Sequence, residues 1–448
     1  MNKSIDSFFQ EHKNIHTKQK IYALQIPILE VQANTWLAKQ TLYPKFYWAN
    51  RDHSEELASL GSVHTLRPAP SCDIKNVYNK IRKVVNNNAD TFFCGGTAFN
   101  SHKHLPPDWK SFGAFYYFVP RFALKKTKEE MLLVIFLRKE ELNDSFAHHL
   151  KSDLARMFPS ATSQTKVTHE INELGNYSII HSQNIPSQEV WCQQIHLIQE
   201  GIKAKQQQKV VLARESRLQL SENLIPEQLL PILQEASNTF DFYLQINSQA
   251  AFLGRSPELL FERSFRNLYS EAVAASLAVE EGVNDLHLEQ FMQDKKSKAE
   301  QGYVIDFLTK KFSFLCQSSN PPTALTTLAH PGLRHLFSSI SGQLKTTIKD
   351  VDIIRALHPT PAVGGFPKRK IMKRLASLES FNRGWYSAPL GIISKHRTIM
   401  AVGIRSMLLN KKNVHLYAGA GIISESVARL EWQELEHKIR NFKDIFYE

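Results

Sequence analysis

Long apolar runs, paired cysteines and low-complexity segments are absent from this chain of 448 residues. The strongest apolar run, residues 131–137, is far too short to span a bilayer. The N-terminal segment MNKSIDSFFQEHKNIHTKQK has no apolar stretch typical of a signal peptide. The cysteines are widely spaced, include no CxxC pair, and stand at Cys72, Cys94, Cys192 and Cys316. We therefore expect free thiols rather than disulfides or a zinc site, and a cytoplasmic protein without a membrane association.

Signatures of nucleic-acid binding are absent as well, although the formal net charge is +12. The lysines and arginines are spread along the chain, with only short clusters at residues 125–128 and 294–298. No helix-turn-helix, zinc-finger or RNP-like pattern accompanies them. A positive field can instead concentrate a small anionic substrate. We expect a small-molecule substrate, no nucleic-acid partner, and a monomer or weak homo-oligomer.

The chain does have the composition of a globular protein, with 42% hydrophobic and 22% charged residues. Aromatic and β-branched runs predict strands at residues 21–32, 46–50, 113–124, 131–138, 209–215, 240–246 and 250–255, with more strands in the last third. A polar loop is expected at 160–166. Helices are predicted at 187–206, with Val190, Ile195, Ile198 and Ile202 as its apolar positions, at about 286–311, and at 426–442. The pattern predicts an α+β fold with large, mostly antiparallel sheets. A variable N-terminal portion (1–185) and a catalytic core (186–448) would form one compact domain.

The run YAGAGI at residues 417–422 follows a predicted strand. Its glycines, Gly419 and Gly421, let the backbone approach a ligand and offer N–H groups to an anion, although an isolated G-x-G is more often a tight turn. Glu431 and Glu434 are three residues apart on the following helix and share a face. Such acids are usually solvated, but beside a glycine-lined loop they indicate a site for a hard cation such as Mg²⁺.

A series of motifs then identifies a resemblance. It comprises KVVLAR (209–214), GRSPELLF (254–261), HLFSSISGQL (335–344), LHPTPAVGGFPK (357–368), RGWYSAPLG (383–391), AVGIRSMLL (401–409) and YAGAGIISES…EWQELEHK (417–438). In this order the motifs resemble the chorismate-utilising enzymes, which include anthranilate, aminodeoxychorismate, isochorismate and salicylate synthases. The match covers about residues 190–448. Residues 40–63 resemble, more loosely, the opening of the menaquinone-pathway isochorismate synthases.

The resemblance implies an isochorismate synthase that isomerises chorismate with Mg²⁺ and without NAD or flavin. In such enzymes water is the nucleophile, activated by a lysine that matches Lys209 here. Glu258 matches the general acid that protonates the departing hydroxyl. Ala274 stands where aminodeoxychorismate synthases carry a nucleophilic lysine, so no covalent intermediate is expected. Without the flanking motifs, Lys209 would be read as a surface lysine at a strand entry and Glu258 as a first-turn helix residue.

The same resemblance implies the remaining site residues. Glu300 and Glu434 would hold Mg²⁺, with Glu431 nearby or acting through water. Arg405 and Tyr386 would bind substrate carboxylate, and a guanidinium offers the planar fork that suits one. Further residues expected at the substrate are Ser276, His335, Thr360, Gly419 and Gly421. Without the resemblance, Arg405 would be interpreted as part of a structural ion pair and Thr360 as a turn residue. Tyr386 and His335 would be interpreted as core residues.

Three motifs depart from the family pattern. Ser297 and Gln301 flank Glu300 where D-x-x-E-H is usual, and Ala275 and Ala388 each replace a usual glycine. Two alternatives to the isochorismate synthase stay open. One is a salicylate synthase, which adds pyruvate elimination in the same pocket and which the motifs hardly distinguish. The other, suggested by the departures, is a catalytically weakened chorismate-binding homologue.

Overall fold

Two large β-sheets form the framework of the protein. The computed structural model describes residues 1–13, 18–67, 73–88, 90–100, 105–159, 177–234, 238–279, 285–330 and 332–447. Within these residues the strands pair antiparallel throughout, which confirms the predicted α+β class. The predicted loop at 160–166 and Cys72 lie outside the described residues.

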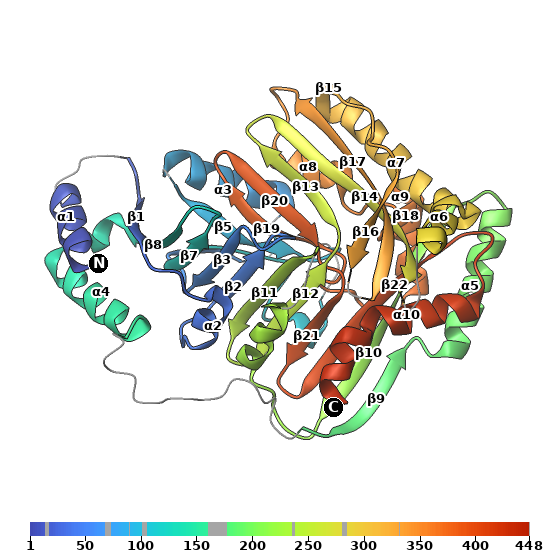
Figure 1. Ribbon diagram of the computed structural model, residues 1–448, viewed down its shortest axis with the longest axis horizontal. Helices are drawn as coiled ribbons and strands as arrows, with labels where there is room; N and C mark the ends of the chain where they lie inside the picture. Colours follow the sequence, from blue (N-terminus) through green and yellow to red (C-terminus); the bar gives the residue numbers. More distant parts are fainter. Residues whose placement is uncertain are drawn as a thin grey trace.

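The first sheet runs through both halves of the chain (Figure 1). Its order is β1 (Ile21–Pro27), β8 (Met131–Arg138), β7 (Phe122–Lys126), β3 (Glu56–Leu60), β2 (Lys45–Ala49), β11 (Phe240–Asn247), β12 (Ala250–Ser256), β21 (Ser406–Asn410), β22 (Asn413–Ile422), β10 (Lys209–Leu220) and β18 (Gly365–Phe366), with β9 (Ile179–Ile185) also paired to β10. The N-terminal portion therefore joins the core through β2 and β11, where Phe46 is opposite Leu244.

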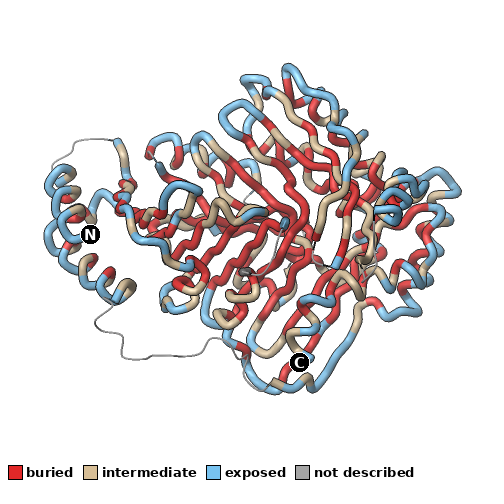
Figure 2. The backbone as a smooth tube through the Cα atoms, viewed as in Figure 1, coloured by how far each residue is buried: buried red, intermediate tan, exposed pale blue. Residues whose placement is uncertain are grey.

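The second sheet also combines both halves. Its order is β15 (Cys316–Ser319), β17 (Leu333–Leu344), β14 (Asn267–Ala278), β13 (Leu259–Ser264), β20 (Arg397–Val402), β19 (Pro389–Ser394), β5 (Phe92–Thr97), β6 (Phe115–Val119) and β4 (His64–Leu66), with β16 (Thr326–His330) also paired to β17. Buried side chains of both sheets, such as Phe46, Phe252 and Phe261, belong to one hydrophobic cluster. The sheets consequently enclose a shared core, which Figure 2 shows as a continuous buried band.

Helices flank the two sheets (Figure 1). They are α1 (Asn2–His12), α2 (Ala33–Ala38), α3 (Ile74–Asn87), α4 (Asp144–Met157), α5 (Gln188–Lys203), α6 (Asp285–Gln293), α7 (Lys295–Leu315), α8 (Asp350–Leu357), α9 (Lys368–Leu378) and α10 (Ala428–Lys443). Helix α7 packs on β14 and β17, and α10 packs on β22. No helix in the described ranges is long and apolar enough to cross a membrane. The helices α7 and α10, which carry the predicted acids, therefore pack on different sheets.

Several predicted elements differ in the structure. The strand predicted at 113–124 is two strands, β6 and β7, that belong to different sheets. The break falls at Pro120, which has no N–H for a ladder, so the chain can leave one sheet there and enter the other. Residues 28–32 do not continue β1.

The helix predictions also need correction. The helix predicted at 286–311 is divided into α6 and α7, because Asp294 caps a new helix by accepting a hydrogen bond from the Ser297 amide at 2.7 Å. Helix α5 spans Gln188–Lys203, shorter than the predicted 187–206. Val190 is 42% exposed, whereas its neighbour Trp191 is fully buried. The aromatic residue therefore takes the core position that was assigned to Val190.

Candidate active site

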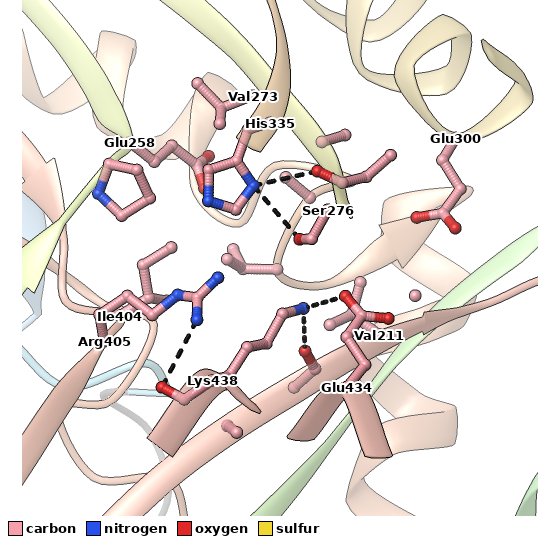
Figure 3. Close-up of a pocket in the computed structure, with 18 of the residues that line it drawn as sticks. Val211, Glu258, Val273, Ser276, Glu300, His335, Ile404, Arg405, Glu434 and Lys438 are labelled. Carbon is pink, nitrogen blue, oxygen red and sulfur yellow. Dashed lines mark hydrogen bonds and ion pairs between the residues drawn. The ribbon is translucent and has the colours of Figure 1, made fainter. Parts of the chain in front are cut away.

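A pocket opens where the start of β10, the β14 and β22 strands, α7 and α10 meet. Figure 3 shows acidic, basic and hydroxyl side chains pointing into it from these elements. Ten predicted site residues line it: Lys209, Glu258, Ser276, Glu300, His335, Tyr386, Arg405, Gly419, Gly421 and Glu434. The other two, Thr360 and Glu431, lie behind the wall and contact residues of the site.

Glu258 immediately precedes β13 and is 2% exposed. The Thr360 hydroxyl donates a hydrogen bond to its Oε1 at 3.0 Å. Burial, with the charge of Glu271, raises the pKa of Glu258 to about 8, although the Thr360 hydrogen bond and Lys209 oppose the rise. At neutral pH this carboxyl group therefore holds a proton, as a general acid must.

Lys209 begins β10 and is 1% exposed. Its Nζ lies 3.2 Å from Glu300 Oε2, on α7. Gly421 of the neighbouring strand lies against both groups, because a Cβ on it would stand 2.7 Å from Glu300 Oε2 and 2.8 Å from Lys209 Cε. Here the glycine is needed for close approach, as the sequence suggested, and not for a turn.

We expect Gly421→Ala to reduce kcat/KM on the order of 10- to 100-fold, because its methyl group must displace Lys209 or Glu300, and small misplacements of reacting groups are costly. Steady-state kinetics beside a thermal melt would measure this. Gly302→Ala on α7 is the matched control, since a Cβ there meets nothing within 4 Å. A normal rate for Gly421→Ala would show that the pair tolerates displacement.

Arg405 and Tyr386 form another part of the pocket wall. Arg405 lies in the break between β20 and β21, with φ +49°, a conformation that non-glycine residues adopt at a cost. Burial lowers its pKa to about 10, so it remains charged at neutral pH. Tyr386 stacks on Tyr417 with ring centroids 5.2 Å apart. A Cβ on Gly419 would stand 2.9 Å from the Tyr386 hydroxyl, which places that hydroxyl at the glycine-lined strand. Arg405 and Tyr386 can both donate to a carboxylate.

His335 and Ser276 form a hydrogen-bonded group on the second sheet (Figure 3). His335 Nδ1 lies 3.2 Å from Ser276 Oγ and 3.0 Å from the Ala275 carbonyl oxygen. Burial, together with Arg405 and His330, holds the pKa of His335 well below its usual value, so the ring is neutral. Its buried Nε2 has no hydrogen-bond partner among the residues that the structure describes. A bound ligand could satisfy this nitrogen.

The acids on α7 and α10 are each matched by a lysine. Beyond the Lys209–Glu300 pair, Lys438 Nζ lies 2.6 Å from Glu434 Oε1 and 2.9 Å from the Gly419 carbonyl oxygen. Lys296 Nζ lies 2.6 Å from Glu431 Oε1. The roles of Lys296 and Lys438 were missed in the sequence. Lys438 stands four residues after Glu434 on the same helix, a spacing that indicates this pair, whereas no local spacing indicates the pair of Lys296 with Glu431.

The pKa values of Glu434 and Glu431 are shifted in opposite directions. Burial would raise the pKa of Glu434, but Lys438 and Lys296 hold it below its usual value. Burial and the charge of Glu434 raise the pKa of Glu431 to about 6. Burial alone would lower the pKa of Lys296, yet the negative charges of Glu431, Glu300 and Glu434 raise it. The three carboxylates therefore stabilise positive charge in this region.

The donor types also fit Mg²⁺, which prefers carboxylate oxygens and substrate oxygens. Across the described part of the chain, no three His, Cys, Asp or Glu side chains converge as a complete metal cage. One or two protein carboxylates completed by substrate and water is the usual arrangement for this ion. Glu300 and Glu434 line the pocket and are the residues that would hold it.

The family departures have distinct structural consequences. Ala275 has φ +53°, the left-handed region where its methyl group is unfavourable and glycine is not. Gln301 donates a hydrogen bond to the Ala272 carbonyl oxygen at 2.9 Å and so ties α7 to β14. Ala388 is buried without a positive φ, so its methyl group causes no backbone strain. Of these three departures, only Ala275 therefore has a strained backbone.

Comparison of the sequence with known proteins identifies the family of the chain. The profile of the chorismate binding enzymes matches residues 7–446. The chain belongs to this family. Among curated relatives of this chorismate binding enzyme, the isochorismate synthase MenF of Haemophilus influenzae is 25% identical over 99% of the chain and 95% of its own length. The chloroplastic isochorismate synthase of Catharanthus roseus is 27% identical over 95% and 80%, respectively.

The fold is shared with solved structures. MenF, the menaquinone-specific isochorismate synthase from Escherichia coli, superposes with a TM-score of 0.82 at 24% identity, and the match covers 99% of each chain. Anthranilate synthase component I from Streptococcus pneumoniae superposes with a TM-score of 0.68 at 17% identity. The family and the fold that the motifs indicated are thus confirmed, and the match includes the N-terminal portion that resembled the family only loosely.

Proposed function

We propose that this chorismate binding enzyme is an isochorismate synthase that acts in the menaquinone pathway of the cytoplasm. The observation that carries the proposal is the placement of Lys209 and Glu258 in one pocket, a potential base and a protonated acid. Relatives over nearly the whole chain bear the name isochorismate synthase MenF. Ala274 lines the pocket where a nucleophilic lysine would be required for covalent chemistry.

The reaction follows from these two groups. Lys209 removes a proton from water, whose oxygen forms a bond to C2 of chorismate. The ring double bonds shift and the C4–oxygen bond breaks, and Glu258 gives its proton to the departing hydroxyl. One water is consumed and one is released, so the net change is an isomerisation without oxidation or reduction. The reverse path uses the same groups with exchanged roles, and the product is an equilibrium mixture.

Substrate carboxylate is assigned to Arg405 and Tyr386. We expect Arg405→Lys to lower kcat/KM by about 10-fold or more although the charge is kept, because a lysine lacks the planar fork that holds a carboxylate through two hydrogen bonds. The measurement is steady-state kinetics with chorismate. An unchanged kcat/KM would assign Arg405 a purely structural role, such as its hydrogen bond to the Lys438 carbonyl oxygen at 3.4 Å.

Glu300 and Glu434 would hold Mg²⁺, with Glu431 beside them. The ion would supply positive charge that neutralises these carboxylates and the ring carboxylate of the substrate. Removal of divalent ions with excess EDTA should lower turnover on the order of 10²-fold, and added Mg²⁺ should restore it. EDTA already saturated with Mg²⁺ is the control for the chelator itself. Full activity in metal-free EDTA would contradict a role for the ion.

The function is tested by incubating the purified protein with chorismate and Mg²⁺ and resolving the products by chromatography. We expect a mixture of chorismate and isochorismate that reaches the same ratio from either side. Salicylate with an equal amount of pyruvate would identify a salicylate synthase. Unchanged chorismate would identify a binding protein and contradict the proposal.

A further inference from the structure

An arginine of the N-terminal portion reaches the strand that carries Glu258. Arg51 follows β2 and makes two hydrogen bonds to Glu271 of β14, one of them from Nη1 to Oε1 at 2.7 Å. Its Nη2 also donates to the Pro257 carbonyl oxygen at 2.6 Å. The guanidinium stacks on the ring of Phe240, 4.6 Å from its centroid. The Glu271 side chain is 2% exposed and that of Arg51 19%, so the carboxylate of this bidentate pair is buried and the guanidinium is largely so.

Glu271 completes the contacts around Glu258. Its Oε2 accepts a hydrogen bond from the Leu259 amide at 3.3 Å. The peptide group before Glu258 is thus held by Arg51, and the one after it by Glu271. The carbonyl oxygen of Glu258 itself accepts from the Val402 amide at 3.1 Å. The Glu258 backbone is consequently fixed on both sides by one buried ion pair.

We propose that Arg51 and Glu271 form a positioning clamp that sets the Glu258 carboxyl group in the pocket, an inference that rests on the proposed function. Neither residue lines the pocket. Both act through Glu258. The clamp also explains why the N-terminal portion, which contributes no predicted catalytic residue, is integral to the active site.

The clamp has an electrostatic consequence. Three groups act on the Glu258 carboxyl group besides burial: Glu271 raises its pKa, whereas the Thr360 hydroxyl and Lys209 lower it. Neutralising Glu271 therefore lowers the pKa of Glu258, and the acid loses its proton at a lower pH. Replacing Arg51 by lysine keeps the positive charge but removes the fork that joins Glu271 to Pro257.

Two variants separate geometry from charge. Glu271→Gln should lower kcat by about 10-fold with little change in KM, because Glu258 is misplaced rather than the substrate. Its alkaline limb of kcat against pH should also move to lower pH. Arg51→Lys should show a similar loss of kcat with the limb near its wild-type position. Thermal melts accompany both variants.

Arg121 and Glu141 provide a matched control outside the pocket. Arg121 makes two hydrogen bonds of 2.6 Å to Glu141 and one of 2.9 Å to the Phe136 carbonyl oxygen, and its side chain is 16% exposed, against 19% for Arg51. Glu141→Gln should affect the melt but neither kcat nor the pH limb. If Glu271→Gln and Arg51→Lys change only the melt, as this control does, the clamp is purely structural and the inference is wrong.

If the wild-type protein leaves chorismate unchanged, the proposed function is wrong. That result does not test whether Arg51 and Glu271 position Glu258. The clamp is then tested by titrating ¹³C-labelled glutamate side chains by NMR in the ligand-free protein, with Glu258→Gln used to assign its signal. Glu271→Gln should move the Glu258 midpoint to lower pH than in the wild type. An unmoved midpoint would overturn the electrostatic part of the clamp, whatever the enzyme's reaction.

Discussion

Glu258→Gln should lower kcat about 10²- to 10⁴-fold at neutral pH, the usual contribution of one positioned proton-transfer group. Glutamine keeps the shape of the side chain but has no proton to give to the departing hydroxyl. In the wild type the rate should fall as the pH rises through about 8, because burial and Glu271 raise the pKa of Glu258 to about 8 and the deprotonated carboxylate is no acid. Initial rates of isochorismate formation between pH 6 and about 9.5 would measure both effects.

Folding should be nearly unchanged in this variant, since the adjoining Leu259 and Leu260 are buried and remain in place. Glu262→Gln is a suitable control because this carboxylate, also on β13, pairs with Arg397 and does not line the pocket. A Glu258→Gln enzyme with a normal rate and a normal melt would assign the proton transfer to another group.

Lys209→Met should lower isochorismate formation by a similar factor, about 10²- to 10⁴-fold. Methionine retains the apolar stem that packs beside Gly421 but cannot accept a proton from water. The assay is product formation from chorismate with Mg²⁺, measured beside a thermal melt. The buried Val210 and Leu212 should preserve the packing of β10.

Lys203→Met, an exposed change in the last turn of α5, controls for the loss of a positive charge. It should leave the rate unchanged. Near-normal turnover of Lys209→Met with a normal melt would mean that water is activated elsewhere, and the proposed roles would have to be reassigned.

Local sequence patterns predicted the bounds of a strand correctly where its side chains are buried uniformly along the segment. Strand β8 was predicted at its observed bounds, because its apolar run is buried almost throughout. The strand predicted at 113–124 could have been divided at Pro120, but only tertiary structure places β6 and β7 in different sheets. Periodicity likewise could not choose between Val190 and Trp191, which are adjacent on one helix.

The site was accessible from the sequence only in part. Motifs preserved in order brought Lys209, Glu258 and Glu300 together correctly in one pocket. The Arg51–Glu271 pair could not be found in this way, because its members are separated by 220 positions and neither touches the pocket. Raised and lowered pKa values depend on burial and on charges from distant segments, which no local pattern contains.

The central claim is that water enters at C2 while the C4 hydroxyl leaves, and isotopic labelling tests it most directly. Chorismate is converted in H₂¹⁸O, and the isochorismate formed early is analysed by mass spectrometry and by the ¹⁸O-induced shift of its ¹³C NMR signals. The account predicts one ¹⁸O atom, bonded to C2, in each molecule of isochorismate. If the oxygen at C2 of isochorismate is instead ¹⁶O from the C4 hydroxyl of chorismate, the hydroxyl migrates within the substrate. That result would contradict water activation by Lys209.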